Sequence, residues 1–128
     1  MFVIGLVLAG VAAIVHVFIF YLESIAWTSK RARATFGTSE QEAETTKALA
    51  FNQGFYNLFL AIAVTVGIVL VAAGARVAGA TLVFAGAGSM AAAALVLLIS
   101  SPDKAAAALK QGVIPALGVI ALAIGLAL

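Results

Sequence analysis

The chain has 128 residues, of which 65% are hydrophobic and 9% charged, and its formal net charge is +2. Soluble domains are about 45–50% apolar, so this composition excludes an ordinary soluble domain and indicates that the chain lies in a bilayer. The lack of cysteine excludes disulfides and thiol chemistry, and the small, dispersed charge argues against a nucleic-acid partner. We therefore expect one integral membrane domain, residues 1–128, whose surroundings are the lipid bilayer.

The first apolar segment runs from about residue 2 to residue 27. It ends at Tyr21 and Trp27, aromatic residues that are typical anchors at a membrane interface. Its length suits a transmembrane helix. No basic region precedes it, so we expect a true span rather than a removable signal peptide. A polar loop is predicted from Thr28 to about Gly37.

The second helix is predicted to begin at Ser39, ahead of the membrane. Ser39 and Glu42 form the Ser-x-x-Glu pattern of a capping box. If the helix continues to Ala73, it is about 51 Å long at 1.5 Å per residue, against about 30 Å of hydrocarbon. Its first turns should therefore lie in water, and its membrane span is expected at about 47–73.

A tight turn at 74–76 is expected before a third span at about 77–99, which is rich in glycine and alanine. Small residues let helix backbones approach closely in membranes. The Ser-Pro-Asp sequence at 101–103 predicts the start of a fourth helix, with its span at about 110–128. Pro115 predicts a kink in that helix, because it removes a backbone hydrogen bond. The fold class predicted is all-α: a polytopic membrane protein, a four-transmembrane-helix bundle with antiparallel neighbours.

Lysine and arginine are unevenly divided between the loops. The first and third loops, at 28–46 and 100–110, carry six of them together with their flanks, and the second carries only Arg76. The positive-inside rule therefore predicts that the first and third loops are cytosolic and that both termini lie outside. The membrane expected is a bacterial inner or plasma membrane.

Polar side chains inside the apolar segments are the strongest indication of function, because an unpartnered amide or charge in hydrocarbon is costly. On the first helix, His16 and Glu23 fall on one line together with Phe20 and Trp27. The heptapeptide at 51–57, Phe-Asn-Gln-Gly-Phe-Tyr-Asn, runs directly into the second apolar stretch. Helical rise puts Glu23 about 6 Å and His16 about 16 Å below the cytosolic boundary, at depths that overlap those of the heptapeptide.

This overlap in depth predicts a shared polar site between the first two helices, in the cytosolic half of the membrane. Asn52 and Tyr56 share one line of the second helix. Gln53 and Asn57 share another, about 100° round, so one neighbouring helix cannot satisfy both. Gln111, at the cytosolic entry of the fourth helix, is a candidate partner for the second line. The ligand-binding residues predicted are His16, Glu23, Asn52, Gln53, Tyr56, Asn57 and Gln111.

Other interpretations of these residues differ in strength. Glu23 lies near the interface, so an ion pair with Lys30 or Arg31 is an alternative. A metal site is not predicted, because His16 and Glu23 are about 10.5 Å apart along the helix axis. One histidine without a nucleophile is a weak sign of catalysis, so no cofactor is expected and an enzyme ranks last. Gly54 would allow the close approach of a backbone or a ligand.

Together, the polar and helix-breaking residues form one pattern: His16, Glu23, Trp27, the Asn52-Gln53-Gly54-Phe55-Tyr56-Asn57 core, Gln111 and Pro115. This pattern resembles that of a family of small bacterial integral membrane proteins, domain-of-unknown-function family 1304 (DUF1304). The resemblance covers nearly the whole chain, and the Asn-Gln-Gly-x-Tyr-Asn core is its most specific part. It implies four transmembrane helices and no established activity.

Two functions are compatible with these observations. The first is the binding or transport of a small amphipathic molecule or lipid through the polar site, which requires a cavity. With only four spans, a transporter would need a homo-oligomer to enclose a pathway. The second is a structural or partner-binding membrane subunit whose polar cluster only locks the helix bundle, and it requires that the cluster satisfy its own hydrogen bonds.

Overall fold

The computed structural model describes residues 1–128, which form helices and no strands. The long helices are α1 (Phe2–Phe20), α3 (Glu40–Ala72), α4 (Arg76–Ser100) and α5 (Ala105–Ala127). The short elements are the π-helical turn η1 (Tyr21–Ile25), the helix α2 (Lys30–Phe36) and the 3-10 turn η2 (Pro102–Lys104). Four helical stretches are long and apolar enough to cross a membrane: Phe2–Ile25, Glu40–Ala72, Arg76–Ser100 and Pro102–Ala127. The all-α prediction is confirmed.

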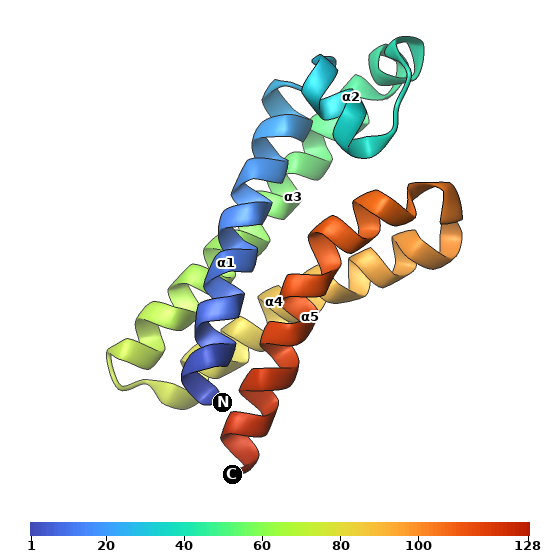
Figure 1. Ribbon diagram of the computed structural model, residues 1–128. Helices are drawn as coiled ribbons and strands as arrows, with labels where there is room; N and C mark the ends of the chain where they lie inside the picture. The colour runs from blue at the N-terminus through green and yellow to red at the C-terminus, as the bar shows by residue number, and fades with distance from the viewer.

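Local sequence explains where these helices begin and turn. The amide N of Glu42 donates to Ser39 Oγ at 3.1 Å, and the amide N of Ser39 donates to Glu42 Oε2 at 3.4 Å, which is the capping box expected. Gly74 has a φ of +90°, which suits glycine and lets the chain reverse between α3 and α4. Pro115 lies inside α5, and the ribbon of α5 changes direction along its length (Figure 1).

The first loop differs from the irregular segment expected, because it contains the short helix α2. At its start, the amide N of Ala32 donates to Ser29 Oγ at 3.2 Å. At its end, Gly37 adopts the left-handed conformation, with a φ of +66°. Serine and glycine are favoured caps at the two ends of a helix, so these residues delimit α2. The prediction of a plain loop from Thr28 to Gly37 was therefore wrong.

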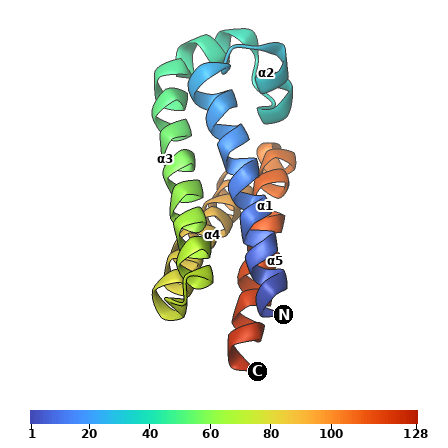
Figure 2. The ribbon, with the colours of Figure 1, turned by 90° about the vertical axis from the view of Figure 1, so that its left-hand side faces the viewer.

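The long helices pack tightly at the end of the molecule that holds both termini and the α3–α4 turn (Figures 1 and 2). We call this the closed end. A Cβ added to Gly5 of α1 would lie 2.5 Å from the backbone N of Leu122 in α5. A Cβ added to Gly67 of α3 would lie 2.7 Å from the carbonyl oxygen of Gly79 in α4. The buried apolar core consists mostly of alanine and valine, together with two larger side chains: Ala9, Ala12, Ala13, Ala61, Val64, Val83, Ala87, Met90 and Leu122.

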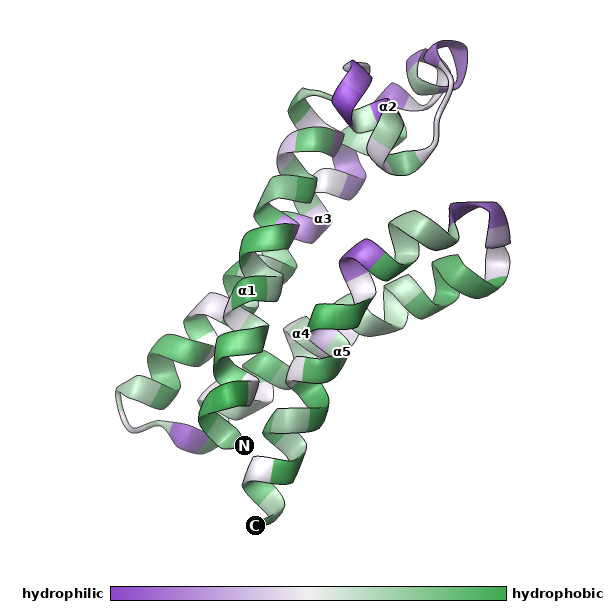
Figure 3. Cartoon of the chain, in the orientation of Figure 1, coloured by the Kyte–Doolittle hydropathy of each residue, from purple (hydrophilic) through white to green (hydrophobic).

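At the opposite end, which we call the open end, the α1–α3 pair and the α4–α5 pair diverge (Figure 1). Hydrophilic segments gather in the loops of this end, whereas the helices below are mostly hydrophobic (Figure 3). The first and third loops meet here, because Lys104 Nζ donates to the carbonyl oxygen of Gly37 at 2.8 Å. The two loops richest in lysine and arginine thus share one end.

Candidate functional site

A cavity of about 490 Å³ lies at the open end, with lining residues from all four long helices. Pockets for small molecules commonly have volumes of about 300–1,000 Å³. Its apolar and aromatic lining consists of Trp27, Phe36, Leu49, Ala50, Tyr56, Leu60, Met90, Ala93, Leu97 and Ala107. Its polar lining consists of His16, Glu23, Thr38, Glu42, Thr46, Gln53, Asn57, Lys104 and Gln111. The surface of the cavity is therefore amphipathic.

Six of the seven residues predicted for the site line this cavity, and Asn52 does not. Helical periodicity placed Asn52 and Tyr56 on one side of α3 and Gln53 and Asn57 on another. Gln53, Asn57 and Tyr56 all line the cavity. Tyr56 is 66% exposed and lies at its edge, while Asn52 is exposed elsewhere on α3. Gln111 is brought to the same cavity from α5.

Glu23 and Asn57 form the buried polar contact of the site. Asn57 Nδ2 donates to Glu23 Oε2 at 2.6 Å and also lies 3.3 Å from the carbonyl oxygen of Gln53. Each of the two side chains is 8% exposed. The alternative ion pair with Lys30 or Arg31 does not form, since the salt bridge found in the chain joins Lys104 and Glu42. Glu23 Oε1 is left without a hydrogen-bond partner from the protein.

His16 is 2% exposed and lies at the cavity wall. Its Nδ1 lies 2.8 Å from the carbonyl oxygen of Ala12. Because a carbonyl oxygen only accepts hydrogen bonds, Nδ1 carries the proton, and in the neutral ring Nε2 presents a lone pair. No protein group donates to Nε2. His16 Nε2 is therefore a second acceptor without a protein partner in the lining of the cavity, in addition to Glu23 Oε1.

The π-helical turn η1 and Gly54 hold Glu23 against α3. A π turn changes the register of a helix by one residue, and such turns are frequent at functional sites. A Cβ on Gly54 would lie 3.0 Å from the backbone N of Ser24 and 3.1 Å from Glu23 Cβ. Ser24 Oγ donates to the carbonyl oxygen of Phe51 at 2.7 Å, which joins η1 to α3. The close approach expected at Gly54 is therefore made by η1, through Ser24 Oγ, the Ser24 backbone and Glu23 Cβ.

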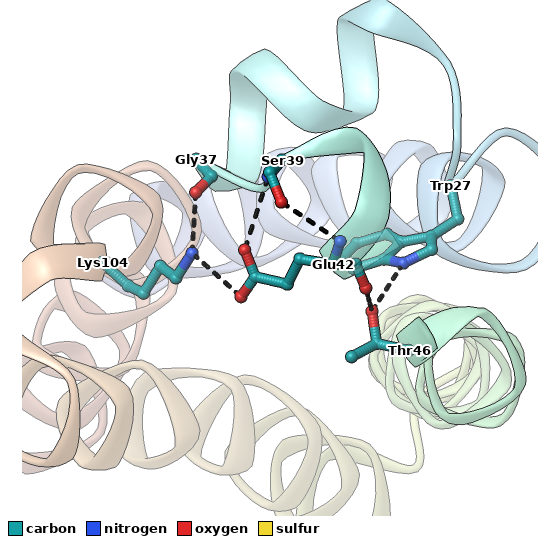
Figure 4. A network of polar contacts seen from close by, with 6 residues as sticks. All are labelled: Trp27, Gly37, Ser39, Glu42, Thr46 and Lys104. Carbon is teal, nitrogen blue, oxygen red and sulfur yellow. Dashed lines mark hydrogen bonds and ion pairs between the residues drawn. The ribbon is translucent and has the colours of Figure 1, made fainter. Parts of the chain in front are cut away.

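Residues that the sequence analysis did not select for the site form a network of polar contacts at the open end, where Glu42 and Lys104 line the cavity and define what we call its mouth (Figure 4). Lys104 Nζ donates to the carbonyl oxygen of Gly37 at 2.8 Å and lies 4.0 Å from Glu42 Oε1. We call these three residues the mouth bridge. Beside it, Trp27 Nε1 donates to Thr46 Oγ1 at 3.1 Å, so this tryptophan lines the cavity and is more than an interface anchor.

Phe20 was expected on the same line as His16 and Glu23, but it packs against Phe55 with ring centroids 5.1 Å apart and does not line the cavity. The chain brings together no group of three His, Asp or Glu side chains that could hold a metal ion. The chemistry that the lining offers is therefore hydrogen bonding, charge and apolar contact.

A family model described as "Protein of unknown function (DUF1304)" matches residues 10–123. The matched region includes every residue that lines the cavity. No curated protein and no solved structure matches the chain.

Proposed function

As the chain belongs to the DUF1304 family, whose description gives no function, we propose from its cavity that it binds or transports a small amphipathic molecule within the membrane. One observation carries the proposal: a cavity of about 490 Å³ combines apolar walls with polar side-chain atoms that have no protein partner, His16 Nε2, Glu23 Oε1 and Thr38 Oγ1. Mostly apolar pockets with a few placed polar groups are typical of small-molecule sites.

The unpartnered groups argue against a cluster that serves only to lock the helices. A locking cluster satisfies its own polar groups, because each buried group left unsatisfied costs about 1–3 kcal/mol. Here Nε2 of His16 and Oε1 of Glu23 lack a partner within the protein but are not fully enclosed by it. Thr38 Oγ1, which belongs to the cavity lining, is also buried without a hydrogen bond. These groups are available to a bound molecule.

We infer that the mouth of the cavity faces the cytosol. The two loops at the open end and their flanks carry six of the seven lysines and arginines, and the turn at the closed end is followed by Arg76 alone. The positive-inside rule then puts the open end in the cytosol and both termini outside, in a bacterial inner or plasma membrane. A ligand would enter from the cytosolic side or from the inner leaflet.

A second candidate function is favoured by a different observation. Asn52 is exposed on α3, away from the cavity, in a helix apolar enough to span a membrane. An amide that faces lipid has no hydrogen-bond partner there, and another protein chain would supply one. This supports a partner-binding subunit or a homo-oligomer. Alanine at Asn52 should then lower the copy number or release the partner, and leave any bound small molecule in place.

Two adjacent alanines of α4 provide a matched test of the cavity. Ala92 and Ala93 are both exposed, but only Ala93 lines the cavity. Ala93→Trp fills part of the cavity, whereas Ala92→Trp adds the same side chain outside it. Native mass spectrometry from a mild detergent should find a co-purified small molecule on the wild-type chain and on Ala92→Trp, and should find less of it on Ala93→Trp.

Two results would contradict the proposal. One is a molecule that remains on Ala93→Trp at the wild-type level, because it then binds elsewhere. The other is a wild-type chain that carries no molecule and also takes up none of a series of added amphiphiles. Native mass spectrometry reports copy number in the same spectrum, so the assembly proposed through Asn52 is tested at the same time.

A further inference from the structure

We infer that the ligand of this cavity is an organic amine with an apolar tail, whose ammonium group binds at Glu23, in the cavity that His16 also lines. The inference rests on the binding function proposed above and names the class of molecule. It follows from three features of the cavity: the hydrogen-bonding character of its buried groups, the balance of its charges, and the position of its aromatic rings.

Three polar atoms of the cavity lining are free acceptors, and Thr38 Oγ1 can both donate and accept. His16 Nε2 has a free lone pair because Nδ1 donates to Ala12, and Glu23 Oε1 has no partner. The amide nitrogen of Asn57 is occupied by Glu23 Oε2 and the carbonyl oxygen of Gln53, which leaves Asn57 Oδ1 as a third acceptor. An ammonium group has three N–H donors and no acceptor, so it complements this set. A carboxylate or phosphate would receive no hydrogen bond from these atoms.

The charges of the lining favour the same class of ligand. Glu23, Glu42 and Lys104 are its formally charged residues, and together they leave one negative charge. Lys104 lies 4.0 Å from Glu42 and is held by the carbonyl oxygen of Gly37, so its charge is offset within the mouth bridge. No lysine or arginine nitrogen lies within 4.0 Å of the Glu23 carboxyl group, although Lys47 lines a second pocket that Glu23 also borders. Charges buried in proteins are paired, and a ligand ammonium would supply the missing partner.

Aromatic rings also line this cavity. Trp27 and Phe36 both line the cavity, with ring centroids 5.3 Å apart, and Tyr56 lies at its edge. Aromatic faces attract cations, so these rings would favour an ammonium group as it passes the mouth. Leu60 and Met90 add apolar wall to the same cavity, where a hydrocarbon tail would be buried.

Trp27 is the one tryptophan of the chain and lines the cavity, so its fluorescence reports directly on occupancy. The protein is placed in nanodiscs of phosphatidylcholine at neutral pH and titrated with three probes of equal chain length: n-octylamine, 1-octanol and sodium octanoate. We expect saturable binding of the amine about tenfold tighter than that of the alcohol, and the weakest binding for octanoate.

Two isosteric variants test whether the preference for the amine over the alcohol depends on the charge of Glu23. Glu23→Gln removes the charge but keeps an oxygen that accepts from Asn57 Nδ2, so the contact between η1 and α3 is retained. Glu40→Gln removes an equal charge at the exposed start of α3, outside the cavity. The preference for the amine should fall to about onefold in Glu23→Gln and stay near tenfold in Glu40→Gln. Partition of the probes into lipid is the same for both variants and cancels.

The outcomes separate this inference from the proposed function. Equal saturable binding of amine and alcohol to the wild-type chain overturns the amine assignment and leaves the binding function standing. Saturable binding of none of the three probes overturns the amine assignment and, if the co-purified molecule is also absent, the binding function. An amine preference that survives in Glu23→Gln overturns the role of Glu23. The comparison of probes on the wild-type chain does not depend on the folding of any variant.

Discussion

The closed end and the open end are built from the same four long helices, but the residues at their contacts differ. At the closed end, Gly67 and Gly79 bring the backbones of α3 and α4 together, and Gly5 does the same for α1 and α5. At the open end, polar and larger side chains line a cavity of about 490 Å³. Small residues allow close packing and larger ones hold helices apart, so residue size contributes to the difference between the packed end and the end that holds the cavity, although Gly54 makes a close contact at the open end too.

This division has a consequence for the cavity. The α1–α3 pair and the α4–α5 pair pack together at the closed end and diverge toward the polar site. The packing at the closed end therefore sets the distance between the walls of the cavity. Close-packed helix contacts change little in volume without strain, and the cavity is therefore largely preformed. Variants that disturb only one end test whether the closed end depends on close backbone contact and the open end on its polar contacts.

The largest effect is expected from a methyl group added at the closed end. A Cβ on Gly79 would meet the backbone of Gly67 and Val71, so Gly79→Ala should destabilise the fold by about 1–3 kcal/mol through overpacking. Gly88 lies on the same helix, and a Cβ there meets nothing within 4 Å. Gly88→Ala should be neutral or stabilising by up to about 1 kcal/mol, because alanine favours a helix over glycine.

Reversible unfolding in mixed micelles, as the fraction of a denaturing detergent rises, measures both free energies. The difference between the two variants is the quantity of interest, since each adds one methyl group to α4. Equal stability of the Gly79 and Gly88 variants would show that the closed end is not held by close backbone contact.

The next effect tests the buried contact of the open end. Asn57→Ala removes the donor to Glu23 Oε2 and leaves a buried carboxyl group unpartnered, so the free energy of unfolding should fall by about 1–3 kcal/mol. Asn52→Ala removes the same amide from an exposed position outside the cavity, and its effect in a monomer should be within about 0.5 kcal/mol.

A double-mutant cycle with Glu23→Gln separates the energy of the contact between Asn57 and Glu23 from the effect of alanine on α3 itself. The glutamine keeps an acceptor, so Asn57→Ala should cost less in that background than in the wild-type chain, where a carboxyl group is left without its donor. If Asn52→Ala and Asn57→Ala lower the free energy of unfolding by the same amount, burial has no influence and the interpretation is refuted.

Much of this architecture was predictable from the sequence, because its signals are local. Apolar length gave the four spans, and Ser39 with Glu42 gave the start of α3. Depth along each helix brought His16, Glu23 and the heptapeptide to one level, and six of the seven residues selected line one cavity.

The features that were missed depend on packing between distant segments. Periodicity separated Asn52 from Asn57 but could not show which of the two faces inward, since that depends on where η1 meets Gly54. The mouth bridge joins residues 67 positions apart, Gly37 and Lys104, and no local pattern marks such a contact. The helix α2 is different, because its caps at Ser29 and Gly37 were visible in the sequence and a reading of capping residues would have found it.

The smallest effect is expected at the mouth bridge. Lys104→Ala removes the hydrogen bond to Gly37 and the ion pair with Glu42, whose side chain is 49% exposed, so the loss of stability should be below about 1 kcal/mol. Lys110→Ala removes an equal charge from an exposed position on α5 that has no partner, and serves as the control.

Lys104→Ala should change access to the cavity clearly even though it changes stability little, because the bridge joins the first loop to the third across the mouth. Quenching of Trp27 fluorescence by acrylamide should therefore rise in Lys104→Ala and stay unchanged in Lys110→Ala. High salt should raise quenching in the wild-type chain toward the level of Lys104→Ala, since it screens the exposed ion pair. If quenching is the same in both variants, the mouth is held by the packing of α2 rather than by the bridge, and access to the cavity is fixed by the fold instead of by a contact that a ligand or ion could release.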